Sequence, residues 1–212
     1  MAGYIIALTG ASGAVYGLRL IEELLKRGDD VELVISPSGF LLLKEEAGID
    51  CEGKDVAKAI LKYFKKTGRA GSRKKPFALT GRLNYTPSNN LYSRLASGSS
   101  LYRAMVICPC SMGTLARISS GISGNLIERA ADCVLKEGGR LVLVPRETPL
   151  NAIHLENMLR LARMGVTMLP AMPAFYTAPR TVEDMVDFVV GKALDSLGVE
   201  NRLYGRWKGP RK

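Results

Sequence analysis

Short apolar runs and helical spacings of apolar residues alternate along the first part of the chain. One continuous run ends at Leu8 and a second covers residues 31–35. After each run, apolar residues recur every three or four positions, as expected for helices that pack on one face. The residues that carry these two helical patterns are Leu18, Ile21, Leu24 and Leu25, and then Phe40 to Ala47. This order predicts a β-α-β-α beginning and therefore a parallel sheet.

The rest of the chain continues this alternation after one interruption. Residues 67–100 are rich in Gly, Ser, Asn and basic residues and show no sustained period, so we predict no element there. We expect strands over 104–107, 141–144 and 166–169, and helices over 54–66, 125–136, 153–164 and beyond Thr181. The expected buried face of the last helix consists of Val182, Met185, Val186, Val189 and Ala193. The pattern predicts an α/β fold with a doubly wound sheet.

A glycine-rich turn joins the first predicted strand to the first helix and reads L-T-G-A-S-G-A-V-Y-G from Leu8 to Gly17. Gly10 and Gly13 permit a tight turn, Gly17 permits close approach of the helix, and Ser12 places a hydroxyl at the helix start. Such a turn can present N–H groups to an anion, although many βα units need these glycines for geometry alone. No Gly-Lys-Ser/Thr follows, which argues against a P-loop. The pattern fits both a cofactor loop and a structural turn.

The end of the second strand bears on the kind of cofactor. A dinucleotide-binding unit typically has Asp or Glu there, which binds the ribose hydroxyls. Here the strand ends at Ser36, and Asp29 and Asp30 precede the strand. The sequence therefore argues against NAD.

A second turn of the same kind follows the strand at 104–107. Its sequence C-P-C-S-M-G-T-L places Ser111 as a candidate N-cap of a helix. In a doubly wound sheet this strand lies beside the first one, so both turns should flank the switch-point crevice. Arg146 and Glu147 follow the next strand and should point into the same crevice. Helix capping by Ser111 and Thr114, and an exposed Arg146–Glu147 ion pair, are the structural alternatives.

Length and composition favour one globular domain. With 212 residues and 47% hydrophobic content, the chain can bury a substantial core, and we expect a domain over residues 1–197 followed by a basic tail over 198–212. It has no apolar run of about 18 residues and no signal-peptide pattern, so we expect a cytoplasmic protein without membrane contact. The four cysteines lack metal-ligand spacing, which predicts buried thiols and no metal. His154, the one histidine, is expected to pack or cap a helix.

The formal net charge of +10 favours anionic partners such as phosphorylated small molecules, nucleic acid or acidic surfaces. Much of the charge lies between Lys62 and Arg82 and in the tail. Solvated loops explain most of it, and the segment lacks the interleaved aromatic residues of a nucleic-acid site, so we expect no nucleic acid. The tail holds the one tryptophan, Trp207, which should dock on a neighbouring subunit or a site.

Four ordered motifs, together with T-G-A-S-G-A, show that the chain resembles the UbiX-type flavin prenyltransferases, formerly labelled phenylacrylic acid or 3-octaprenyl-4-hydroxybenzoate carboxy-lyases. The motifs are C-P-C-S-M-G-T-L, N-L-I-E-R-A-A-D, L-V-P-R-E-T-P and I-H-L-E-N-M-L, and the resemblance runs from Tyr4 to about Trp207. It places the chain in the homo-oligomeric flavin-containing Cys decarboxylase-like fold group. It implies a Rossmann-like three-layer sandwich with a mostly parallel sheet, and FMN bound between subunits of a dodecamer built from trimers.

The resemblance also implies the reaction. A dimethylallyl group moves from dimethylallyl monophosphate to N5 and C6 of reduced FMN without a metal. The prenylated FMN serves a UbiD-type decarboxylase, as in ubiquinone biosynthesis. The sequence leaves open whether the pyrophosphate is also accepted, which decarboxylase receives the product, which pathway is served and what the basic segment does.

Site residues carry over from the matching motifs. The resemblance implies a catalytic set of Glu147, Ser12, Glu46 and Lys136, in which Glu147 corresponds to the acid that protonates the departing phosphate. The implied FMN contacts are Gly10, Ala11, Ser12, Ser36, Ser111, Met112, Gly113, Thr114 and Arg146. The implied donor site consists of Tyr176, Lys192, Trp207 as an aromatic wall, and Arg129 from this or an adjacent subunit. Cations and aromatic faces suit an allylic carbon that loses phosphate.

Two departures from the family pattern concern the substrate entrance. The basic connection between Lys62 and Arg82 is longer than usual, and Asn84-Tyr85 replaces a common Asp-Trp pair. The alternative function within the fold group is a flavin-dependent decarboxylase of a cysteine-derived substrate. That chemistry uses a catalytic histidine, for which His154 is poorly placed.

Overall fold

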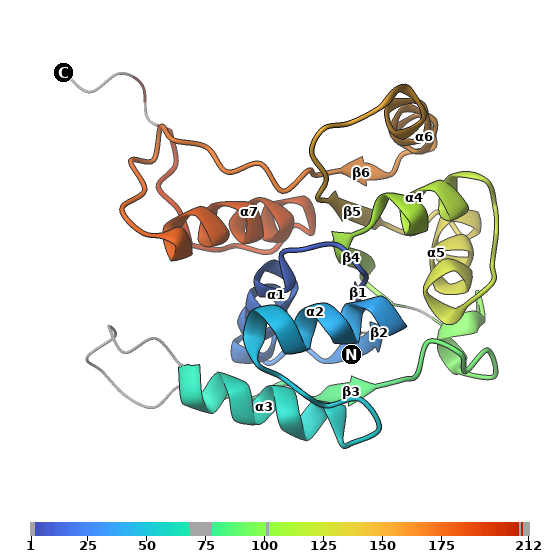
Figure 1. The fold of residues 1–212 in the computed structure, drawn as a ribbon, viewed down its shortest axis with the longest axis horizontal. Coiled ribbons are helices and arrows are strands. Elements are labelled where there is room, and N and C mark those ends of the chain that lie inside the picture. The colour runs from blue at the N-terminus through green and yellow to red at the C-terminus, as the bar shows by residue number, and fades with distance from the viewer. Residues whose placement is uncertain (1–2, 68–77, 101, 208, 210–212) are drawn as a thin grey trace.

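A six-stranded parallel sheet forms the centre of the protein in a computed structural model that describes residues 3–67, 78–100, 102–207 and 209 (Figure 1). The strand order is β3-β2-β1-β4-β5-β6, and all neighbouring strands in the described part of the chain pair in parallel. The strands are β1 (Tyr4–Leu8), β2 (Val31–Ile35), β3 (Leu83–Tyr85), β4 (Ala104–Cys110), β5 (Leu141–Pro145) and β6 (Thr167–Met168). The predicted α/β class is confirmed, and the switch point lies between β1 and β4.

Helices cover both faces of the sheet, which gives the expected three layers (Figure 1). One hydrophobic cluster contains residues of α1, α2, α3 and α7, and the other contains residues of α4, α5 and α6. The first group of helices is α1 (Ala14–Lys26), α2 (Pro37–Ala47), α3 (Val56–Thr67) and α7 (Val182–Ser196). The second group is α4 (Met112–Ser119), α5 (Leu126–Lys136) and α6 (Ala152–Arg163).

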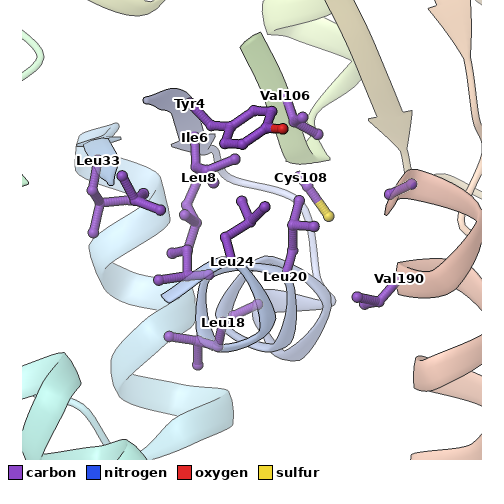
Figure 2. Close-up of a cluster of buried hydrophobic side chains, with 14 of the residues drawn as sticks. Tyr4, Ile6, Leu8, Leu18, Leu20, Leu24, Leu33, Val106, Cys108 and Val190 are labelled. Carbon is purple, nitrogen blue, oxygen red and sulfur yellow. The ribbon is translucent and has the colours of Figure 1, made fainter. Parts of the chain in front are cut away.

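Strand β1 is buried on both sides because its side chains alternate between the two clusters. Ile6 and Leu8 belong to the α1 side, whereas Ile5 and Ala7 belong to the α4–α6 side. This arrangement explains why the strand reads as a continuous apolar run. Figure 2 shows the α1 side, where leucines of α1 pack below β1 and Val190 approaches from α7.

Gly17 lets α1 approach the sheet, as the sequence predicted. A Cβ atom added at this position would lie 2.2 Å from the carbonyl oxygen of Cys108 in β4. Glycine is therefore required at position 17 because α1 packs closely against β4.

Two short elements lie in residues 67–100, where we predicted none. Strand β3 pairs with β2, and the 3₁₀ helix η1 (Arg94–Ala96) follows. Both are held by Glu32, a buried carboxylate of β2 that accepts hydrogen bonds from Asn84 Nδ2 (3.1 Å) and from Arg94. The prediction was wrong here because a three-residue strand held by a polar side chain leaves no apolar period. Residues 68–77 of the predicted basic segment lie outside the described residues.

The apolar faces of α6 and α7 differ from a simple amphipathic reading. Leu161 is the residue of α6 that is fully buried, whereas Leu155 and Leu159 are 52% and 51% exposed. In α7, Val186 belongs to the core as expected, but Val182 is exposed because it stands at the first helical position, beyond the core. Periodicity located both helices and the buried residues Val186, Val189 and Ala193 of α7, but it did not show which side of α6 is covered.

The predictions that the cysteines are buried and that His154 packs or caps a helix are confirmed. All four cysteines are free and buried, and burial raises the pKa of the Cys110 thiol to about 12. His154 caps α6, since its Nδ1 accepts a hydrogen bond from Asn151 N (3.4 Å) and its own N–H donates to Asn151 Oδ1 (2.9 Å). In the described part of the chain, no group of His, Cys, Asp and Glu side chains is arranged for a metal ion, and no helix has the length and apolarity to cross a membrane.

Candidate active site

Thr9 joins the two turns that flank the switch point. Its side-chain Oγ1 donates to the carbonyl oxygen of Pro109 (2.9 Å) and accepts from the backbone N–H of Ser111 (2.7 Å). The Thr9 side chain is buried, so these bonds fix the turn after β1 against the turn after β4. The two turns therefore lie side by side at the switch point, as expected. Sequence reasoning missed Thr9, although a hydroxyl directly after a buried strand was a usable signal.

The amino end of α1 is closed by a carboxylate from α2. Glu46 Oε2 accepts hydrogen bonds from the backbone N–H groups of Gly13 (2.9 Å) and Ala14 (2.8 Å). Partial burial acts to raise the pKa of Glu46, but hydrogen bonds from the Ser12 hydroxyl and these two amides, together with the charge of Arg146, hold it below its ordinary value. The anion at this helix start is therefore a side chain of the protein itself.

Arg146 connects the turn after β5 to the first turn. Its Nε donates to the carbonyl oxygen of Ser12 (2.9 Å). This bond brings Ser12, Glu46 and Arg146 into one group, although 134 residues separate Arg146 from Ser12. The proposed exposed ion pair with Glu147 is absent among the described residues. Instead, Glu147 is exposed and accepts a hydrogen bond from Thr148 N (3.0 Å).

Glu147 and Arg146 border a small hollow of about 70 Å³ at the carboxyl end of β5. The opposite wall comes from Pro170 to Met172 in the loop after β6. The acid is thus exposed beside the Arg146 group.

The second turn leaves open space above the start of α4. Ser111 caps this helix, because its Oγ accepts from Thr114 N (3.3 Å) and donates to Thr114 Oγ1 (3.0 Å). Met112 is 7% exposed and packs into the core, so only its backbone can serve the crevice. A Cβ atom at Gly113 would meet nothing within 4 Å. The start of α4 therefore has open space beside Gly113.

The turn after β2 completes this edge. Ser36 caps α2 by accepting from Gly39 N (3.0 Å). A Cβ atom at Gly10 would lie 2.4 Å from Cβ of Ser38, so the turn after β1 and the turn after β2 are in direct contact. The backbone from Gly10 to Ala11 thereby lies between the β2 and β4 turns.

An aromatic group with a nearby cation lies over α7. The Tyr176 ring contacts Phe188 and Trp207 edge to face, with centroid distances of 5.9 Å and 5.8 Å. Lys192 lies four residues after Phe188 and hence on the same side of the helix. Lys192 is exposed, and no described residue forms a hydrogen bond or ion pair with it. An aromatic face and an ammonium group are therefore available together.

Arg129 and Lys136 lie apart from the other predicted site residues. Arg129 binds Asp132 (2.8 Å) and Lys136 binds Glu137 (2.6 Å). Lys136 precedes β5 and Glu147 follows it, and a five-residue strand spans roughly 13 Å at its usual rise. Within one chain the structure does not bring Lys136 to Glu147.

Together these features define a class of protein. A doubly wound parallel sheet with amides, hydroxyls and an arginine at its switch-point crevice binds nucleotide-like cofactors. FMN fits this crevice, because the space at Gly113 and the donors of the β4 turn and Arg146 can receive a phosphate-bearing flavin.

Comparisons with known proteins agree. The Flavoprotein family model matches residues 3–194. The flavin prenyltransferase UbiX of Halalkalibacterium halodurans is 50% identical over 204 residues, covering 96% of this chain and 92% of that protein. A crystal structure of AnUbiX in complex with FMN and dimethylallyl pyrophosphate matches with a TM-score of 0.83 and 33% identity, covering 99% of both chains. A dodecameric FMN-dependent UbiX-like decarboxylase from Escherichia coli O157:H7 matches with a TM-score of 0.82 and 38% identity, covering 98% of this chain and 100% of that one. The chain belongs to the flavin prenyltransferase UbiX family of flavoproteins.

Proposed function

We propose that the protein is a flavin prenyltransferase that moves a dimethylallyl group from dimethylallyl monophosphate to reduced FMN. The observation that carries the proposal is that the Ser12–Glu46–Arg146 group and the exposed Glu147 stand at the switch-point crevice of a UbiX-family chain. The relative solved with FMN and dimethylallyl pyrophosphate supports the substrate class. The product would then serve a UbiD-type decarboxylase.

The flavin side of the site uses the turns. FMN supplies the ring atoms N5 and C6 that accept the group. Ser12 and Glu46 share a hydrogen bond at the first turn, so they can hold or move a proton there. Arg146 and the backbone amides of Met112 and Gly113 would hold the anionic part of the cofactor.

The donor side uses the aromatic group on α7. When the bond between the allylic carbon and phosphate breaks, negative charge grows on oxygen and positive charge on carbon. Lys192 stabilises the departing phosphate, and the faces of Tyr176 and Trp207 stabilise the carbon. Glu147 would donate a proton to the phosphate, and its exposure at the hollow after β5, next to Arg146, supports this role.

We also propose that the working form is a homo-oligomer, since one chain holds only part of the predicted site. Arg129 and Lys136 belong to α5, on the sheet face opposite α7, so they can complete a donor site only for another copy (Figure 1). Exposed large apolar side chains on and after α6 support self-association. These are Ile153, Leu155, Leu159 and Met164, which are 66%, 52%, 51% and 56% exposed. The dodecameric relative supports the same conclusion.

The alternative decarboxylase has less support in the chain. Its chemistry needs a catalytic histidine, and His154, the one histidine of the sequence, caps α6 through its Nδ1.

The test is anaerobic incubation of the purified protein with reduced FMN and dimethylallyl monophosphate, followed by mass analysis of the flavin. We expect a flavin heavier by one dimethylallyl group, and an unchanged mass would overturn the proposal. Decarboxylation of a cysteine-derived thiol with unaltered FMN would support the alternative instead.

One substitution then tests the role of Glu147 as the proton donor. Glu147→Gln should slow product formation while FMN still binds, whereas Glu52→Gln, which alters another exposed carboxylate, should act like the wild type. A full rate for Glu147→Gln would remove its assigned role.

A further inference from the structure

The segment after α7 folds back on that helix and ends at the donor site. It turns at Gly198, whose φ of +72° favours glycine. Val199 is buried in the core beside α7. Asn201 then donates through Nδ2 to the carbonyl oxygen of Gly191 (3.1 Å) and to Asp195 Oδ1 (2.9 Å). The chain is thus fixed at two points before it reaches Trp207.

Asp195 is the centre of a polar clamp formed by Asp195, Asn201, Tyr204 and Arg206. Arg206 binds it with both terminal nitrogens, at 2.8 Å to Oδ2 and 2.6 Å to Oδ1. Tyr204 Oη donates to Oδ2 (2.5 Å). Bidentate and charge-assisted bonds of this kind fix direction as well as position. One carboxylate therefore orients both Tyr204 and Arg206.

The protonation states suit this clamp. Burial and the bond to Asp195 raise the pKa of Tyr204 to about 12, so its hydroxyl remains a donor at neutral pH. Burial acts to raise the pKa of Asp195, but the hydrogen bonds from Arg206 and Tyr204 hold it below its ordinary value.

The Tyr204 ring packs against α7. A Cβ atom at Gly191 would lie 2.5 Å from Cδ1 of Tyr204, so only glycine leaves room there. The ring also contacts Phe188 at a centroid distance of 5.0 Å. Because Phe188 contacts Tyr176 and Tyr176 contacts Trp207, the clamp and the donor site share one row of aromatic rings.

Trp207 needs such support. Its side chain is 64% exposed, and its described ring contact is the one with Tyr176. Arg206 immediately precedes it, so the two bonds to Asp195 set the direction in which the chain enters Trp207. We propose that Asp195, Tyr204 and Arg206 are positioning residues of the allylic donor site, which act by holding Trp207 against Tyr176. This inference rests on the proposed function, in which Tyr176 and Trp207 form the aromatic part of that site.

The experiment uses the full-length protein and Asp195→Asn, which keeps the side-chain size and removes the charge. Trp207 is the one tryptophan, so intrinsic tryptophan fluorescence reports it alone, without FMN or donor. We expect stronger acrylamide quenching and a KM for dimethylallyl monophosphate raised about tenfold, the size expected when a charged bidentate hydrogen bond is lost. Turnover number and FMN affinity should change little.

Two further variants keep the result decisive. Arg206→Lys retains the charge without the forked geometry, so its quenching and KM should lie between those of the wild type and Asp195→Asn. If Asp195→Asn does not fold, Arg206→Lys alone tests the inference. Asp30→Asn breaks another arginine–aspartate pair, with Arg82 (2.7 Å), and should leave quenching and KM unchanged.

Each failure has a separate meaning. Unchanged quenching in both clamp variants would overturn the inference, and so would increased quenching with an unchanged KM. A wild-type protein that never alkylates FMN would overturn the proposed function, while the quenching experiment would still decide whether the clamp holds Trp207.

Discussion

Replacing Gly17 by alanine tests how closely α1 approaches the sheet. The new Cβ atom would lie 2.2 Å from the carbonyl oxygen of Cys108, whereas ordinary contact begins at 3.4 Å. The separation must therefore grow by about 1.2 Å, the difference between these two distances. Since the obstacle is a backbone oxygen in the central strand β4, α1 has to move as a body.

The expected cost follows from two opposing effects. Overpacking a core costs about 1–3 kcal/mol, and the upper part of that range applies because no side chain can rotate away. Alanine regains about 1 kcal/mol of helix propensity relative to glycine. The net loss should be about 2 kcal/mol, or about 4–8 °C in Tm for a domain of this size. Because α1 begins at the first turn, its shift should also weaken FMN binding.

Denaturant unfolding without FMN and a flavin-binding titration measure the two effects. Gly113→Ala is the matched control for stability, because it also adds a methyl group to a helix but meets nothing within 4 Å. A Gly17→Ala protein with wild-type stability would refute the close approach of α1 to β4.

Three further predictions concern the site. Gly113→Ala should be at least as stable as the wild type, because alanine favours a helix, yet it should bind FMN more weakly, since its methyl group occupies the space assigned to the cofactor. Equal FMN affinity in a titration would show that FMN does not occupy that space. Glu46→Gln should destabilise the protein by about 1 kcal/mol at neutral pH, the size of a lost helix cap reduced by solvent exposure. In the folded protein the pKa of Glu46 lies below its ordinary value of 4.5. The stability difference is therefore present above pH 4.5 and disappears as the pH falls through the folded-state pKa, so unfolding curves of both proteins at about pH 7 and pH 3 check the sign. Lys192→Ala should raise the KM for dimethylallyl monophosphate about tenfold without altering FMN affinity, while Lys62→Ala on α3 should not; similar KM values for the two variants would contradict the role of Lys192.

Sequence patterns predicted the parts of the fold in which burial follows a period. β1 is buried on both sides and reads as an unbroken apolar run. β2 is apolar except for Glu32, and the observed strands have the predicted bounds at residues 4–8 and 31–35. β3 could not be predicted in this way. Its three residues include one buried side chain, Leu83, and it is held through Asn84 by the carboxylate of Glu32. Such a bond joins residues far apart in the sequence and leaves no local pattern.

The same distinction applies to the site. The two glycine turns and Ser111 were visible because a cap or a turn has a local signature. The closure of α1 by Glu46, 32 residues away, depends on how α2 packs and has no such signature. Glu46 entered the prediction only through the family resemblance. The Asp195 clamp was missed for the same reason, since its members are ordinary surface residue types until the chain folds back on α7.

The two turns at the switch point therefore differ in what they can bind, although they look alike in sequence. At α1 the first amides already bind the carboxylate of Glu46, and a second anion there would meet a like charge. At α4 the cap is the uncharged hydroxyl of Ser111, which accepts from Thr114 N, and the space beside Gly113 is open. The Arg146 side chain donates to the carbonyl oxygen of Ser12 and so adds a cation beside the first turn. A phosphate-bearing flavin should thus place its anion toward α4, which leaves the first turn for the uncharged part of the molecule. This arrangement would bring Ser12 and Glu46, the groups able to hold a proton, to the reacting end of the flavin, and it gives the glycine turn a role in positioning the acceptor instead of binding phosphate.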